Sequence, residues 1–314
     1  MTQNNPLVSI VICCYNRRDL LRKTLNSVLL QNYEPVEIIV VDDGSVDGTE
    51  EMVRQSYHEI KYFRQENAGI SAARTHGCQK AKGRYIAFQD DDDLMPENRI
   101  VTLMSALRSC PDCVLAVGDW MEIDENDSTT GNRWLPENVS VRGPQVISDG
   151  YEAILWPRVP AVPHTTLFER SVGTKVGWFD ERLRYASEDK DFFARVALEG
   201  SIVYVPEIVS YYRRGHASLT NNSLTVYSSM VYLFQKHLRA YGGRMSSHMH
   251  NRVVDRMILA LLNIKAATGN HGTNVLTLEE MNDVYSLMSP KQRVSLAIRA
   301  KLRKIKVLIG EKKK

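Results

Sequence analysis

The sequence has few cysteines and no long hydrophobic run, and each scarcity argues against a class of protein. Its 314 residues include one Cys-x-x-Cys pair, which is weak evidence for zinc because a zinc site usually needs four ligands. We therefore expect reduced thiols, two of them in a buried strand at 13–14. No apolar stretch approaches the roughly 20 residues that cross a bilayer, which argues against a spanning helix. The five cysteines are Cys13, Cys14, Cys78, Cys110 and Cys113.

The N-terminus also lacks the basic segment and apolar run of a secretory signal, and we expect it to lead directly into a strand. Charged residues make up 25% of the chain and aromatic residues 8%, an ordinary globular composition that argues against wholesale disorder. The length is enough for one large domain or two modest ones.

The first 120 residues alternate between strand patterns and helix patterns, which is typical of parallel strands joined by helical crossovers. Apolar, β-branched runs predict strands at 8–14, 36–41, 61–64 and 85–88, with helices capped by Asp19 and at 70–81. Further on, the pattern predicts strands at 114–120, 164–168 and 201–205, a helix at 188–198 and a polar loop region at 124–150. From about Ser223 the pattern is helical to the end, which predicts a boundary near residue 220.

Polar residues cluster directly after three of these strands. Asn16-Arg17, Asp42-Asp43 and the run Asp90–Asp93 each follow the end of a strand. In an open α/β sheet, ligands bind in the crevice outside the carboxyl ends of the strands. These loops are therefore predicted to form a ligand site.

Each acidic cluster has two interpretations. Four adjacent carboxylates raise one another's pKa unless a cation compensates them, and a divalent ion that bridges to phosphates would do so. Otherwise Asp90–Asp93 is a solvated loop that caps the helix beginning near Pro96. A carboxylate at Asp42 can accept hydrogen bonds from a nucleoside, whereas Asp47 and Thr49 suit an Asx turn and a helix cap.

Six segments stand in a characteristic order: VSIVICCYNR, VEIIVVDDGSVDGT, QENAGISAART, GRYIAFQDDDDLMP, GWFDE and SEDKDFFARV. Together they resemble glycosyltransferase family 2 over about residues 6–220. The resemblance implies an inverting enzyme with an α/β fold of the GT-A type, a Rossmann-like, mostly parallel sheet flanked by helices, and here a helical C-terminal extension. It implies a nucleotide-sugar-binding half at 1–115 and an acceptor-binding half with the catalytic base at 116–220. The helical pattern beyond it predicts a helical region at 221–314 with a basic amphipathic tail.

The resemblance assigns substrate contacts where the residues match the family pattern. Tyr15 and Arg17 would line the nucleotide pocket, and Asp42 would hold the base, often uracil in this family. Arg74, in the segment QENAGISAART, would lie near the base or the diphosphate.

The resemblance also implies a site for Mg²⁺ or Mn²⁺. Asp90 and Asp92 fit the family's Asp-x-Asp pattern, with Asp92 as the direct metal ligand through which the diphosphate is held. The aspartates lie one residue closer to Pro96 than the family pattern has them, so Asp91 or Asp93 could take either role.

Asp189, in Ser187-Glu188-Asp189, matches the family's catalytic base. Inversion by direct displacement needs one carboxylate to take the proton of the acceptor hydroxyl as the anomeric bond forms. The leaving diphosphate needs a metal to absorb its charge. Glu188 would support the acceptor. The alternative is that both are acidic first-turn residues favoured by the helix dipole.

Several basic and aromatic residues are weaker candidates. His216 falls where related enzymes have a basic loop that can close over the diphosphate, although a plain surface loop fits as well. Arg213 and Arg214 could clamp phosphate oxygens. His164 is expected to be a strand residue, and Trp178 a packed core aromatic rather than part of an acceptor pocket.

The net charge of +3 hides an asymmetry. Residues 291–314 contain ten Lys or Arg and one Glu, a net charge of +9, which leaves −6 for the other 290 residues. In this segment apolar residues recur at helical spacing, and such a basic amphipathic helix suits an anionic membrane surface. The alternative is a helix packed on the body; an RNA-reading motif is absent, so we expect no nucleic-acid partner.

These features predict a cytoplasmic enzyme, peripheral on the inner face of the cytoplasmic membrane. It would move a sugar from a nucleotide sugar, with a UDP-sugar favoured, to a saccharide or lipid-linked acceptor in bacterial surface polysaccharide or glycolipid assembly. A nucleotidyltransferase would need a basic, Gly-rich phosphate loop, which 14–17 does not supply. A non-catalytic nucleotide-sugar-binding protein is the other alternative, and the presence of Asp90, Asp92 and Asp189 argues against it.

Overall fold

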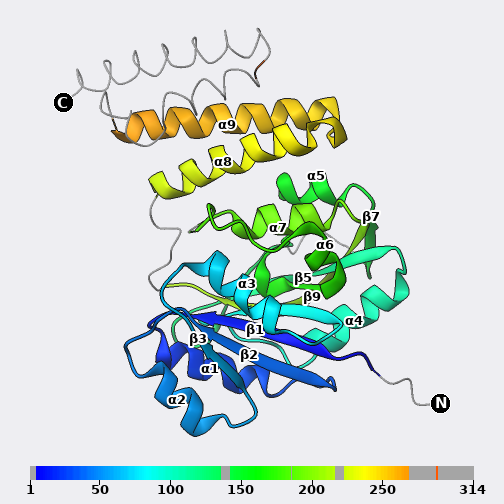
Figure 1. The fold of residues 1–314 in the computed structure, drawn as a ribbon. Helices are drawn as coiled ribbons and strands as arrows, with labels where there is room; N and C mark the ends of the chain where they lie inside the picture. Colours follow the sequence, from blue (N-terminus) through cyan, green and yellow to red (C-terminus); the bar gives the residue numbers. More distant parts are fainter. Residues whose placement is uncertain (1–4, 136–141, 185, 216–222, 269–287, 289–314) are drawn as a thin grey trace. The chain divides into compact units, whose positions relative to one another are not determined.

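The structure, a computed structural model, describes residues 5–135, 142–184, 186–215, 223–268 and Met288 (Figure 1). The chain forms two compact units, Met1–Ser218 and Leu219–Lys314. The first unit is α/β and the second, where it is described, is helical.

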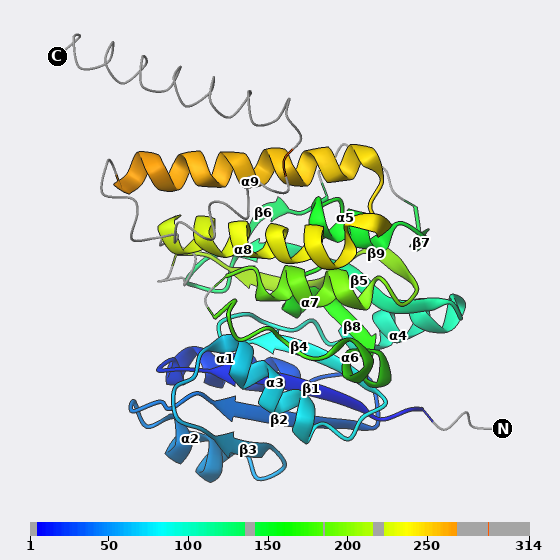
Figure 2. The same cartoon turned by 45° about the horizontal axis from the view of Figure 1, so that its top comes forward.

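The first unit is built on one sheet. Across the described residues its strands have the order β3-β2-β1-β4-β8-β5-β9-β7, with β6 paired to β5 (Figures 1 and 2). The first four of these run parallel, β8 runs antiparallel to β4 and β5, and β5 and β9 run parallel. The predicted mostly parallel sheet is confirmed. The strands are β1 (Val8–Cys14), β2 (Val36–Asp42), β3 (Lys61–Arg64), β4 (Tyr85–Asp90), β5 (Cys113–Ile123), β6 (Thr129–Arg133), β7 (Gln145–Ile147), β8 (Thr166–Glu169) and β9 (Ser201–Arg213).

Helices cover both faces of this sheet. They are α1 (Arg18–Val28), α2 (Thr49–Ser56), α3 (Ile70–Lys80), α4 (Arg99–Ser109), α5 (Gly150–Leu155), α6 (Arg170–Val176) and α7 (Glu188–Val196), with the 3-10 turn η1 (Pro163–Thr165). Successive strand side chains point to opposite faces. Ile10 and Ile12 pack in one core cluster with residues of α1, α2 and α4, whereas Val11 faces α3. Gly77 allows that close approach, because a Cβ there would lie 2.3 Å from Cγ1 of Val11.

Three local predictions are wrong. The region 124–150, predicted as a polar loop, contains β6 and β7, whose polar residues gave no strand pattern. His164 lies in the turn η1, and β8 begins only after it. Asp19 does not cap α1, because Arg17 occupies the N-cap position and the backbone N–H of Arg18 donates to the carboxylate of Asp47 instead, at 2.9 Å.

An aromatic cluster fixes α7 against the sheet. Its rings come from Phe88 in β4, Phe168 in β8, Phe192 and Phe193 in α7, and Phe179 and Trp178 before it. Trp178 stacks on Phe192 with 6.2 Å between ring centroids, so its predicted packing role is confirmed. Arg195 of α7 donates to three backbone carbonyls of the segment 176–178, which ties this helix to the preceding turn.

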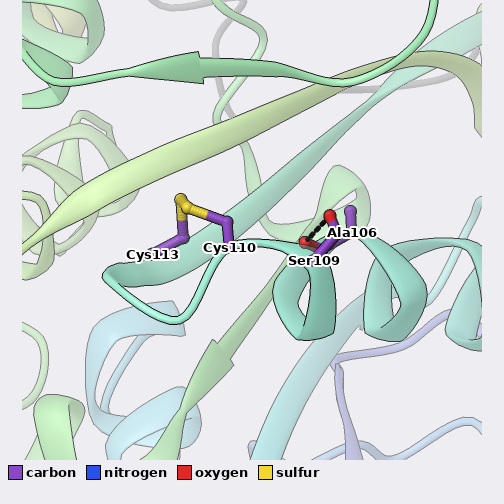
Figure 3. The surroundings of a disulfide bond; sticks show 4 residues. All are labelled: Ala106, Ser109, Cys110 and Cys113. Atoms are coloured by element: carbon purple, nitrogen blue, oxygen red, sulfur yellow. Dashed lines mark hydrogen bonds between the residues drawn. A yellow bond between two sulfur atoms is a disulfide. The ribbon is translucent and has the colours of Figure 1, made fainter.

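The cysteines are only partly as expected. Cys110 and Cys113 form a disulfide just beyond the end of α4 (Figure 3), so the prediction of reduced thiols is wrong for this pair. The chain turns tightly after Ser109, and the backbone N–H of Cys113 donates to the carbonyl of Cys110 at 2.9 Å. This turn brings the two Cα atoms to 5.3 Å, within the usual range for a disulfide. Cys13, Cys14 and Cys78 are free and buried.

The second unit consists of α8 (Ser223–Tyr241), the 3-10 turn η3 (Gly242–Arg244) and α9 (Ser247–Thr268), with α8 and α9 in contact. The two helices bury apolar side chains that include Val231 and Phe234 in α8 and Val254 and Met257 in α9. The prediction of helix from about Ser223 is confirmed for these residues. Within the described parts of the chain, no helix has the length and apolar character needed to span a membrane. The basic segment 291–314 lies outside the described residues.

Candidate active site

The candidate site lies beyond the carboxyl ends of the central parallel strands. Cys14, the last residue of β1, pairs in register with Asp42 of β2, and Cys13 pairs with Asp90 of β4. The two predicted acidic loops therefore leave the sheet on either side of the same strand. Tyr15, which follows β1, is 49% exposed beside them.

The loop after β2 is held by its own carboxylate. Asp42 is fully buried; one oxygen accepts the backbone N–H of Ser45 at 2.7 Å and the other accepts the Tyr62 hydroxyl. Asn16 adopts a left-handed conformation (φ 52°), and its side-chain oxygen accepts the backbone N–H of Val46 at 2.8 Å. The loops after β1 and β2 are thus locked together, and Asp42 has a fixed orientation.

Asp43, which the sequence placed in a polar cluster without a role of its own, organises the segment before α3. Its carboxylate accepts the backbone N–H groups of Ala68 and Gly69, both at 2.9 Å, and the side-chain amide of Gln65 at 2.8 Å. Gly69 has φ 90°, a conformation that favours glycine. This anchoring sets the start of α3 and so the position of Arg74, one turn further on.

Arg74 joins the two predicted catalytic loops. It is only 6% exposed, and its guanidinium donates to Asp90 at 2.9 Å and to Glu188 at 2.6 Å. Asp189 follows directly in the first turn of α7, where Ser187 before it has a left-handed backbone (φ 66°). The structure therefore brings Arg74, Asp90 and Glu188 into one hydrogen-bonded group, and Asp189 is the next residue after Glu188.

Arg17 pairs with the acidic loop from the other side. Its guanidinium donates to Asp91 at 3.0 Å and also to Asp92. Burial, together with the charge of Asp92, raises the pKa of Asp91 to about 7, and Arg17 opposes that rise. Asp91 and Asp92 are therefore engaged with a protein cation.

Asp90, Asp93 and His164 form the group that could hold a metal ion. One ligand atom of each lies within 4.8 Å of the others. Asp93 is fully buried; its Oδ1 accepts the backbone N–H of Arg213 at 2.8 Å, while its Oδ2 has no hydrogen-bond partner. Nδ1 of His164 lies 3.6 Å from that Oδ2 and 2.8 Å from Oγ of Ser210.

The chemistry of these donors suits a divalent cation. Burial raises the pKa of Asp93 well above its ordinary value, and the charges of Asp92 and Asp90 add to this. Burial lowers the pKa of His164 to about 4, which leaves the imidazole neutral and able to ligate. Two carboxylates and a neutral imidazole are ligands that Mn²⁺ or Mg²⁺ accepts. The grouping differs from the predicted Asp90 and Asp92, since Asp93 turns inward and Asp92 turns to Arg17.

The predicted basic residues have mixed placements. Arg213 is 2% exposed and donates to the backbone carbonyls of Asp92 (2.8 Å) and Asp124 (3.0 Å). It therefore holds the backbone of the acidic loop. Arg214 lies 3.5 Å from Glu122, with its guanidinium over the ring of Tyr212. Their contact with phosphate stays a prediction, and His216 lies outside the described residues.

The family model described as Glycosyl transferase family 2 matches residues 9–172. RT0329, an uncharacterised glycosyltransferase of Rickettsia typhi, is 30% identical to the chain over 228 residues, which cover 71% of this chain and 70% of RT0329. The chain therefore belongs to glycosyltransferase family 2, and it is a glycosyltransferase. The resemblance on which the predictions rested is confirmed.

Two further comparisons concern a relative and a fold. TuaG of Bacillus subtilis, a glycosyltransferase named for teichuronic acid biosynthesis, is 38% identical over 117 residues, which cover 35% of this chain and 46% of TuaG. The structure of S. aureus TarS 1–349 in complex with UDP-GlcNAc matches with a TM-score of 0.62 at 17% identity, covering 89% of this chain and 79% of that one. At this identity the match bears on the fold alone, and the fold is the predicted GT-A type.

Proposed function

We propose that this glycosyltransferase moves a sugar from a UDP-sugar to a saccharide or lipid-linked saccharide with inversion of the anomeric centre. The observation that carries the proposal is the position of Arg74, which donates to both Asp90 and Glu188. This one side chain links the loop proposed for the diphosphate with the helix turn proposed for the base. Donor and acceptor chemistry would then meet at a single point.

The reaction is a direct displacement. Asp189 takes the proton of the acceptor hydroxyl while that oxygen bonds to the anomeric carbon, and the bond from this carbon to the diphosphate oxygen breaks. The electron pair leaves with the nucleoside diphosphate. Glu188, held by Arg74, supports the acceptor beside Asp189.

Asp90, Asp93 and His164 are the residues that would hold Mg²⁺ or Mn²⁺. When bound, the ion supplies positive charge for the leaving diphosphate. This assignment replaces Asp92 by Asp93, since the structure pairs Asp92 with Arg17. Arg17 and Asp91 would line the phosphate side of the nucleotide pocket.

Tyr15 and Asp42 are the proposed contacts for the nucleoside. Tyr15 offers an exposed ring at the end of β1, and Asp42 is held by Ser45 and Tyr62. The fold shared with TarS, whose structure holds UDP-GlcNAc, supports a UDP-sugar donor. The similarity to TuaG supports an acceptor in bacterial surface polysaccharide assembly.

Nucleotide-dependent thermal stabilisation tests the donor. We expect UDP, among UDP, GDP, CDP and dTDP, to raise the melting temperature most, and Mn²⁺ to increase that rise. A ligand at 100 times its Kd stabilises the native state by about 2.7 kcal/mol. The Mn²⁺-dependent part should disappear in Asp93→Asn and persist in Asp92→Asn. Equal shifts for all four nucleotides, or none, would argue against a UDP-sugar donor.

We also propose that residues 291–314 bind an anionic membrane surface from the cytoplasmic side. Ten basic residues against one acidic residue favour anionic headgroups, at about 1 kcal/mol per Lys or Arg near the surface. The full chain should sediment with vesicles of phosphatidylcholine and phosphatidylglycerol, and high salt should release it. A chain ending at 290 should stay in the supernatant. If it sediments equally well, this segment is not the membrane contact.

A further inference from the structure

Arg99, the first residue of α4, is a fully buried cation outside the residues assigned so far. Burial lowers its pKa to about 9, while the charges of Asp90 and Asp93 oppose that fall. The guanidinium is therefore protonated at neutral pH. Its charge interacts electrostatically with two of the candidate metal ligands, Asp90 and Asp93. Burying a charged Arg is costly unless its N–H groups are hydrogen-bonded, so the hydrogen bonds of Arg99 must offset much of that cost.

One side of the guanidinium holds the end of β4. Nη1 donates to Oε1 of Gln89 and Nη2 donates to the backbone carbonyl of Phe88, both at 2.8 Å. Asp90 follows Gln89 directly as the last residue of this strand. Arg99 therefore fixes the backbone immediately before a candidate ligand.

The same Nη2 reaches the segment that carries the imidazole. It donates to the backbone carbonyls of Pro163 at 3.3 Å and Thr166 at 3.2 Å. These two residues flank His164 and Thr165 in the turn η1 and the start of β8. Asp90 and His164 lie on separate parts of the chain, and this guanidinium is bonded beside each of them.

We infer that Arg99 is a positioning residue that holds the β4 end and the η1 turn at the spacing that lets Asp90, Asp93 and His164 share one cation. The inference rests on the metal site proposed above and adds a residue that contacts neither the ion nor the substrate. A planar fork of donors suits several carbonyls at once, whereas the ammonium of Lys is a compact point charge. The charge also offsets part of the repulsion within the acidic loop before an ion binds.

The test is the affinity of the purified full chain for Mn²⁺ without nucleotide. The free ion is detected by electron paramagnetic resonance as Mn²⁺ is titrated. Arg99→Lys keeps the charge and removes the fork, and we expect Mn²⁺ binding at least 10-fold weaker, since outer-shell substitutions cost about 10- to 100-fold in metal affinity. Affinity for UDP in EDTA should stay within about twofold, which a general loss of folding would not allow.

Arg195→Lys is the matched control. Arg195 is also a buried Arg in a helix of the same unit, and it donates to Asp191 and to the carbonyls of Val176, Gly177 and Trp178. It should lose stability in denaturant as Arg99→Lys does, yet bind Mn²⁺ as the wild type does. If Arg99→Lys fails to fold, Arg99→Gln, which keeps a planar donor group, takes its place.

The outcomes separate this inference from the metal site itself. Wild-type Mn²⁺ affinity in a folded Arg99 variant overturns the positioning role and leaves the site standing. Equal weakening in the Arg99 and Arg195 variants also overturns it, because the loss would then reflect stability alone. A wild type that binds no Mn²⁺, with Asp93→Asn indistinguishable from it, overturns the proposed metal site instead.

Discussion

Asp189→Asn is expected to lower kcat for sugar transfer by about 10²- to 10⁴-fold, the range usual for loss of a general base. The amide has the size of the carboxylate but cannot accept the proton of the acceptor hydroxyl. Asp189 lies in the first turn of α7, where Glu188 is buried and Asp189 is only half-buried. The fold should therefore survive. Release of UDP from UDP-sugars, with a panel of saccharide and glycolipid acceptors, measures the rate.

Two comparisons make this result specific. Asp112→Asn, an exposed substitution at the turn before β5, should leave kcat unchanged. The thermal shift of Asp189→Asn with UDP should match the wild type, because the base is not a donor contact. A folded Asp189→Asn protein with wild-type kcat would remove Asp189 from the mechanism.

Glu188 provides the test between the two neighbouring carboxylates. Burial, with the charge of Asp189, raises its pKa to about 7, a value that would also suit a base. Its carboxylate, however, accepts Nη1 of Arg74 at 2.6 Å, which commits it to a buried ion pair. We therefore assign proton transfer to Asp189, and a larger loss of kcat in Glu188→Gln than in Asp189→Asn would reverse the assignment.

The sequence predicts the first half of the sheet well because its signals are local. Runs such as Val8–Cys14 are buried on both faces, and an acidic residue directly after such a run must emerge at the carboxyl edge. That reasoning put Asp42 and Asp90 at the carboxyl ends of their strands, where the structure has them, and their roles in binding stay predictions. It failed for β6 and β7, because short strands at 129–133 and 145–147 have mostly exposed side chains and no apolar alternation.

The grouping of the candidate metal ligands could not be read from the sequence. The path of the loop after β4 decides which of the four adjacent aspartates turns inward. In this loop Asp93 accepts the backbone N–H of Arg213 from β9, and Asp92 forms an ion pair with Arg17. His164 joins them only because η1 is placed beside β4, more than seventy residues away in the chain. Arg99 lies in no sequence motif, and its proposed positioning role follows only from its hydrogen bonds in the folded structure.

Arg74→Met is expected to cost about 3–5 kcal/mol of unfolding free energy at pH 8, the usual penalty for removing one partner of a buried ion pair. Arg74 is the cation between Asp90 and Glu188, and it is 6% exposed. Without it, the buried carboxylate of Glu188 and the half-buried carboxylate of Asp90 both lose the cation that compensates them. Met fills similar volume along the side chain, so the loss is electrostatic rather than a cavity. Denaturation by urea measures the cost.

The matched control is Arg84→Met. Arg84 forms an exposed ion pair with Glu169 at 3.4 Å, and such surface pairs contribute about 0–1 kcal/mol. Its loss should therefore be small at any pH. If Arg74→Met costs no more than Arg84→Met at pH 8, the buried pair does not stabilise the site.

The pH dependence of the stability loss in Arg74→Met shows whether Arg74 acts through its charge or through packing. Arg74 holds the pKa of Asp90 below its ordinary value and opposes the rise in the pKa of Glu188. Its removal therefore raises both folded-state pKa values: that of Asp90 from below the value in the unfolded chain, because burial then acts with less opposition, and that of Glu188 further above it. Carboxyl groups with raised folded-state pKa values destabilise the fold above those values and cease to do so as pH falls towards the unfolded values. The gap between Arg74→Met and the wild type should therefore be narrower at pH 5.5 than at pH 8. A gap of constant size would mean that Arg74 stabilises the site by packing rather than by charge.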